Sequence, residues 1–189
     1  MNSTRRDFLK LGPLAPFAGV WEGDKGKDES PDDDRATIEH NVFRERIVLE
    51  PIGLVENHEQ SLYGLRYAKT AWRLGVQESF HEEVGYWLWD ADRGEVMRCF
   101  MVPRGSTILA GGSCKANASS FSMTAKIGDE GFGVLSNPYL LQKAKCIEYN
   151  LNCSIENGIW TYDEDTVLEM ADTGNTLHHT DKNVLKKVG

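Results

Sequence analysis

From residue 38 onward, the chain is a succession of short segments rich in β-branched and aromatic residues, separated by glycine, asparagine, aspartate and proline. Helical periodicity is weak throughout, and the best helical stretch, residues 137–145, is short. Such a pattern is typical of an all-β protein. The segments with strand character cover about 38–52, 58–74, 80–90, 94–103, 106–115, 118–127, 144–156, 159–171 and 176–188.

Alternation of apolar and polar residues is clearest near the C-terminus. The apolar positions of residues 146–155 are Ile147, Tyr149, Leu151, Cys153 and Ile155. Asn157-Gly158 then gives a two-residue hairpin signal, because both positions of such a turn favour positive φ. The following segment places a further apolar set on one face, namely Trp160, Tyr162, Leu168 and Met170.

Nine or ten strands joined mostly by tight turns predict a meander that closes on itself, since closure removes exposed sheet edges. We therefore expect a single antiparallel up-and-down β-barrel of about ten strands, similar to lipocalins and fatty-acid-binding proteins. A barrel of this width leaves an internal cavity for a small ligand. We assign residues 1–10 to an N-terminal tail and residues 11–189 to the barrel domain.

Charge and hydropathy exclude two classes of partner. The net charge is -8, whereas nucleic-acid-binding surfaces are usually basic. No apolar run approaches the roughly 20 residues that a membrane-spanning helix needs. We expect neither a nucleic-acid nor a membrane partner.

Two features bear on location. The four cysteines show no C-x-x-C pair and no zinc-ligand spacing, which favours free thiols in a reducing cytoplasm. The segment from Thr4 to Lys10 resembles a twin-arginine export signal, which would mean export of a folded protein. Pro13 and Pro16 interrupt the apolar stretch after it, and a cleavage site is hard to place. We favour a cytoplasmic protein, with export as the alternative.

Several polar groups are candidates for chemistry. Residues 24–36 predict a solvated acidic loop, with Asp32-Asp33-Asp34 as part of it rather than a cation site. Alternation places His81 and Glu83 on one strand face, where charge balance is a sufficient role. His178 and His179 are adjacent, so one faces the interior of a barrel and the other faces solvent.

Three motifs in order resemble the nitrobindin family of haem-binding β-barrels. The segment from Leu11 to Gly23 is similar to the family's opening, whose G-x-W-x-G-x-G motif is matched by Gly19, Trp21 and Gly23. Lys25 stands at the third glycine and Gly26 follows it. The run from Phe80 to Trp87 resembles a His-x-Glu-x-Gly-Tyr strand. The third match runs from Val167 to Met170, continues at His179 and ends at Leu185–Val188.

The resemblance implies ferric haem b whose iron is held by a histidine on the last strand. That position corresponds to His179, with His178 as the fallback, while His81 and Met170 correspond to residues near the cofactor. It also implies nitric oxide binding and isomerisation of peroxynitrite to nitrate. Trp21 is expected to close one end of the barrel as core. An axial histidine needs an acceptor for its other ring nitrogen, and we expect a backbone carbonyl as readily as a side chain, because alternation does not place Asp181 at the ring.

An alternative function of a different class is a carrier that binds a fatty acid or another apolar molecule and contains no haem. It requires a basic side chain inside the barrel to anchor a carboxylate, for which Arg66, Arg98 and Lys126 are candidates. As a protein partner we consider a second copy of the chain, forming a homodimer.

Overall fold

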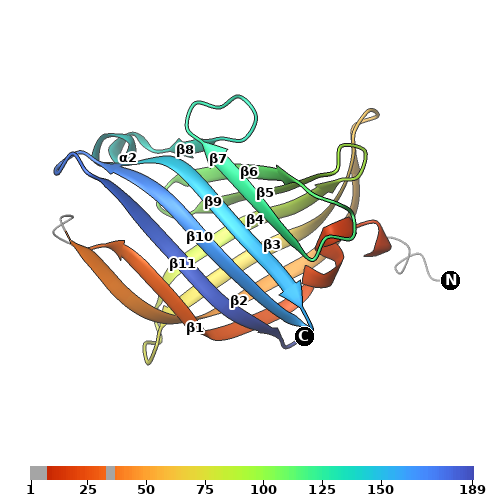
Figure 1. Ribbon diagram of the computed structural model, residues 1–189, viewed down its shortest axis with the longest axis horizontal. Coiled ribbons are helices and arrows are strands. Elements are labelled where there is room, and N and C mark those ends of the chain that lie inside the picture. Colours follow the sequence, from red (N-terminus) through yellow and green to blue (C-terminus); the bar gives the residue numbers. More distant parts are fainter. Residues whose placement is uncertain (1–7, 33–36) are drawn as a thin grey trace.

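The strands pair into one closed antiparallel barrel, shown in the computed structural model of Figure 1. The structure describes residues 8–32 and 37–189. Neighbours around the ring follow the order β1-β2-β3-β4-β5-β6-β7-β9-β10-β11, and β11 pairs with β1. The short strand β8 pairs with β6 beside this ring. The strands are β1 (Gly19–Pro31), β2 (Ile38–Glu56), β3 (Ser61–Arg73), β4 (Ser79–Asp90), β5 (Glu95–Val102), β6 (Ser106–Ser113), β7 (Ser120–Lys126), β8 (Val134–Ser136), β9 (Ala144–Glu156), β10 (Ile159–Met170) and β11 (Thr176–Lys187).

The predicted barrel of about ten strands is thereby confirmed. The helical stretch expected near 137–145 is the helix α2 (Pro138–Lys143), whose first turn is capped by the Asn137 side chain. The four cysteines are free. No helix of the described residues is long and apolar enough to cross a membrane. Most of the twin-arginine-like segment, residues 4–7, lies outside the described residues.

The predicted solvated loop at 24–36 is wrong for most of its length. Strand β1 continues through this region to Pro31 and pairs with β2 on one side and β11 on the other. Its exposed charged side chains alternate with inward ones, and Asp28 is buried. The acidic composition therefore reflects the outer face of a strand that completes the ring. Asp33 and Asp34 lie outside the described residues.

A β-bulge interrupts β1 at the position where the glycine motif departs from the family pattern. Gly23 pairs with Glu45, but Gly26 pairs with Phe43, so β1 contains one extra residue. A Cβ atom on Gly26 would lie 2.6 Å from the Phe43 ring. The bulge brings Gly26 to the inward position against this ring and reverses the inward and outward sets of the residues after it.

One end of the barrel is closed by aromatic side chains and by the 3-10 helix η1 (Gly12–Phe17). Trp21 is fully buried, and its indole N–H donates a hydrogen bond to the Phe17 carbonyl at 2.7 Å. Its ring lies edge-on to Trp160, with centroids 5.7 Å apart. Trp21 is therefore core, as the sequence predicted.

Candidate functional site

A cavity of about 560 Å³ lies at the end of the barrel opposite the Trp21 cluster. Its volume falls within the roughly 300–1,000 Å³ of small-molecule and cofactor sites. Apolar side chains from β2, β5, β6, β8 and β10 form much of the wall, among them Phe43, Phe100, Ile108, Val134 and Leu168. Charged and other polar side chains contribute to the rest of the lining, among them Asp28, Lys69, Glu83, Arg104, Glu164 and Asp181.

All three residues expected at the cofactor line this cavity. His179 on β11, His81 on β4 and Met170 at the end of β10 contribute to its wall. His178 points outward, with a side chain 60% exposed and its Nδ1 2.8 Å from Asp165. The register of β11 therefore selects His179 as the inward histidine.

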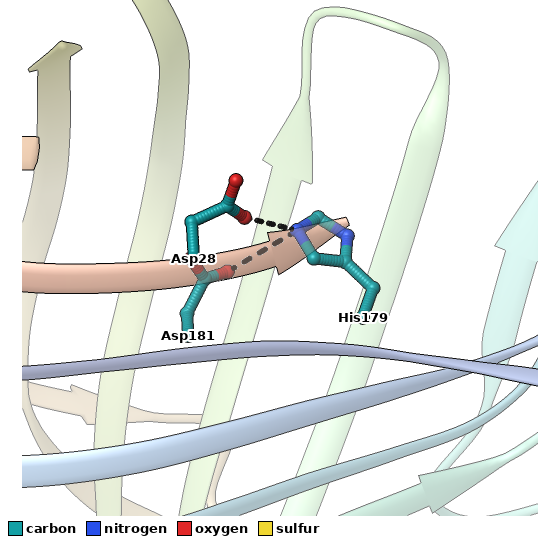
Figure 2. A group of neighbouring side chains, drawn as sticks. All are labelled: Asp28, His179 and Asp181. Atoms are coloured by element: carbon teal, nitrogen blue, oxygen red, sulfur yellow. Dashed lines mark hydrogen bonds and ion pairs between the residues drawn. The ribbon is translucent and has the colours of Figure 1, made fainter. Parts of the chain in front are cut away.

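His179 contacts two carboxylates from inside the barrel, as Figure 2 shows. Its Nε2 lies 2.8 Å from Asp28 Oδ1 and 3.6 Å from Asp181 Oδ2. The expectation that Asp181 is not placed at the ring is wrong, because residues two apart on a strand share a face. Asp28, which the sequence analysis assigned to a solvated loop, is the closer acceptor.

Burial and neighbouring charges shift the pKa values of these three groups in opposite directions. Burial lowers the pKa of His179, but Asp28 and Asp181 outweigh it and the pKa lies above its usual value. Burial raises the pKa of Asp181 to about 6. Burial also opposes ionisation of Asp28, yet hydrogen bonds from His179, Asn41 and Ser30 bring its pKa below the usual value.

Below the cavity, the barrel contains a network of buried charges. Arg98 donates to Tyr67 at 2.9 Å and to Glu164 at 3.2 Å, and it also contacts Glu83. Its side chain is 2% exposed, so these carboxylates neutralise the guanidinium out of water.

A second cation belongs to the same network. The ammonium of Lys69 lies 3.5 Å from Glu45 and 3.8 Å from Glu83. Glu45 also accepts hydrogen bonds from Tyr162 at 2.8 Å and Asn183 at 2.7 Å. The cations of the barrel interior are thus held by protein carboxylates.

His81 and Glu83 share a face of β4, as the alternation predicted. His81 Nε2 lies 2.8 Å from Glu83 Oε1, and the pair connects the cavity wall to the buried charges. Glu82 points to the exterior. His81 is therefore held in place by a carboxylate.

Of the three cations considered as anchors for a fatty-acid carboxylate, two lie on the outer surface and the third is already paired with carboxylates. Arg66 and Lys126 are on the outer surface, with side chains 63% and 55% exposed, near Glu50 and Glu148. Arg98 points inward, but two carboxylates already pair with it.

Sequence reasoning missed Asp28, Glu45, Lys69 and Glu164. The inward position of Asp28 depends on the bulge in β1. The other three are charged residues at inward strand positions, and the alternation around Tyr162 in β10 was the available signal for Glu164.

Three comparisons place the chain among known proteins. A search of curated proteins found no match to the sequence. Among solved structures, the crystal structure of Rv2717c from M. tuberculosis matches with a TM-score of 0.64 and 15% identity, covering 95% of this chain and 98% of that one. This likeness shows the barrel fold. The family model described as "THAP4-like, heme-binding beta-barrel domain" matches residues 10–187. Because that match covers nearly the whole sequence, the chain belongs to the THAP4-like haem-binding β-barrel family, the nitrobindin family.

Proposed function

We propose that the cavity binds ferric haem b with His179 as the axial ligand, and that the protein binds nitric oxide there. The observation that carries this proposal is the hydrogen bonding of the His179 ring. One ring nitrogen is paired with Asp28, while no hydrogen bond to Nδ1 is found among the described residues. An imidazole that ligates a metal commonly donates its other N–H to a carboxylate, which fixes the ring.

The rest of the cavity suits a flat apolar cofactor with carboxylate arms. Phe43, Phe100 and Met170 supply apolar wall, and the volume is of cofactor size. Arg104 is an exposed cation on the cavity wall and would pair with a haem carboxylate. The residues present therefore fit a histidine-ligated haem.

When bound, ferric haem would supply an iron that binds nitric oxide and isomerises peroxynitrite to nitrate. The chain's own residues favour the first of these ligands. The buried carboxylates Glu45, Glu83 and Glu164 outnumber the buried cations Arg98 and Lys69 that pair with them, so an approaching anion meets net negative charge in a medium that screens it poorly. Nitric oxide is neutral and has no such cost, whereas peroxynitrite is an anion. We therefore propose nitric oxide binding as the main activity, with peroxynitrite isomerisation secondary.

The test is a haem titration of the purified haem-free protein, followed by the Soret absorption. The wild type should give a saturable band with one haem per chain, and His179→Ala should lose it. His178→Ala is the matched control, because it removes the neighbouring histidine on the outer face. Equal Soret bands in wild type and His179→Ala would overturn the assignment of the ligand. Nonspecific uptake by all three proteins would overturn the haem proposal itself.

A further inference from the structure

We propose that Asp28, His179 and Asp181 form a binding site for one divalent transition-metal ion on the cavity wall. This site requires Asp181, whereas the proposed haem site does not. One imidazole nitrogen and one oxygen from each carboxylate all lie within 4.8 Å of one another. The three side chains converge from two neighbouring strands (Figure 2).

Strand register fixes this convergence. Asp28 of β1 and Asp181 of β11 are direct partners in the antiparallel pairing. Directly opposed residues project from the same face of a sheet, with Cβ atoms roughly 4.5–5.5 Å apart. His179 precedes Asp181 by two residues and therefore shares that face. The cluster thus follows from the backbone pairing as well as from the side-chain conformations.

The bulge in β1 supplies the first carboxylate. Trp21 is inward, so unbroken alternation would turn residues 23, 25 and 27 inward and Asp28 outward. The extra residue between Gly23 and Gly26 reverses this order, and Asp28 is 3% exposed. The residue at which the glycine motif departs, Lys25, lies within the bulge. The β-bulge in β1 therefore places Asp28 on the same face as His179 and Asp181.

The charges around the cluster leave a place for a cation. Among the described residues that line the cavity, Asp28, Glu83 and Glu164 are buried and acidic, and Lys69 is buried and basic; Arg98 pairs with Glu83 and Glu164 but not with Asp28. Lys69 is already shared between Glu45 and Glu83. Asp28 and Asp181 repel each other in a poorly screened site, and a bound cation would offset that repulsion in place of the His179 proton that now lies between them.

The donor set selects the class of ion. An imidazole and two carboxylates suit Zn²⁺, Co²⁺ or Mn²⁺, and three protein ligands leave coordination positions for water or a substrate. Ca²⁺ prefers about 6–8 oxygen ligands, which this cluster does not provide. The ion would bind His179 Nε2 and Asp28, whereas the proposed haem site needs that nitrogen and that carboxylate hydrogen-bonded to each other, so each should exclude the other.

The test is a titration of the full-length, haem-free protein with Co²⁺, followed by its visible absorption, and with Zn²⁺, followed by calorimetry. We expect one saturable site in the wild type and a loss of affinity of at least about tenfold in Asp181→Asn and in Asp28→Asn. Asp165→Asn is the matched control, because Asp165 forms a similar pair with His178 on the outer face. It should retain full affinity. Circular dichroism of each variant checks that the barrel is folded.

The haem titration separates this proposal from the previous one. Asp181→Asn should bind Co²⁺ at least about tenfold more weakly and retain the Soret band, because the proposed haem site uses Asp28 rather than Asp181 to orient His179. Absence of saturable metal binding to the wild type would overturn the metal site whatever the haem result. Undiminished binding in folded Asp181→Asn, or equal loss in Asp165→Asn, would overturn it as well.

Discussion

The guanidinium of Arg98 lies 3.2 Å from the carboxylate of Glu164, inside the barrel, with side chains 2% and 8% exposed. Arg98 also contacts Glu83, so one cation is held between two buried carboxylates. Taking such charges out of water is costly, and the cost is repaid only while every partner is present. The pair therefore makes the interior sensitive to the loss of any one charge.

Replacing Arg98 with methionine should destabilise the protein by about 3–5 kcal/mol, because Glu83 and Glu164 would remain buried without their cation. The measurement is urea unfolding at neutral pH. Arg66→Met is the control, since Arg66 is exposed and its ion pair with Glu50 should contribute less than about 1 kcal/mol. Equal midpoints for the two variants would contradict the importance of the buried pairing.

The pH dependence of stability should report on Glu83. Burial opposes its ionisation, but Arg98 and Lys69 outweigh burial and hold its pKa well below the usual value. A carboxyl whose folded pKa is depressed contributes stability above its unfolded pKa, about 4.3, and loses it as pH falls through the folded pKa. The difference in unfolding free energy between wild type and Glu83→Gln should therefore be largest near neutral pH and shrink in acid.

The control for this comparison is Glu82→Gln on the outer face of the same strand. Glu82 accepts a hydrogen bond from Ser79 at 3.1 Å in an exposed setting, so its replacement should change stability little at any pH. A Glu83→Gln difference that stays constant from neutral pH into acid would show that the native carboxylate is not stabilised by its neighbours.

The barrel was predictable from the sequence because strand periodicity and turn residues are local signals. Trp160 and Tyr162 alternate as a strand requires, and Asn157 and Gly158 occupy a turn with positive φ at both residues. Even so, alternation failed at the bulges. In β9, residues Cys146 and Glu148 pair with successive residues of β10, so Cys146 lines the cavity at the place expected for Ile147.

The pairing of the charged residues in the site could not be predicted from the sequence, for a different reason. Glu45 and Tyr162 form a hydrogen bond across 117 positions of sequence, and no local pattern pairs these two residues. Whether these two residues meet depends on how the strands close into a barrel. Asp28 required both ring closure and the bulge in β1, and no local pattern indicates either.

Gly85, in the strand that resembles the family's His-x-Glu-x-Gly-Tyr motif, should not tolerate a side chain. A Cβ atom there would lie 1.9 Å from the Cys99 carbonyl oxygen and 2.7 Å from Phe100 Cα, both backbone atoms of β5. Gly85→Ala should therefore push the two strands apart, with a loss of about 1–3 kcal/mol or more. Thermal unfolding measures this loss.

Gly131→Ala is the control for that substitution, because nothing lies within 4 Å of a Cβ atom at Gly131. It should leave the unfolding temperature nearly unchanged. If Gly85→Ala behaved in the same way, the close approach of β4 and β5 at this point would be refuted.

A fatty acid should bind weakly in the barrel, since the buried cations of the described residues, Arg98 and Lys69, are already paired with carboxylates, and Arg104 on the cavity wall is exposed to water. Arg98 is paired with Glu83 and Glu164, and Lys69 with Glu45 and Glu83. A bound carboxylate would face several buried carboxylates at short range, where repulsion is poorly screened. Displacement of a fluorescent fatty-acid analogue by dodecanoate should reveal no saturable site in the wild type. Glu164→Gln, which removes one competing charge from Arg98, should bind the analogue more tightly. Saturable wild-type binding with a Kd below about 1 μM, a free energy near −8 kcal/mol, would instead favour the carrier function.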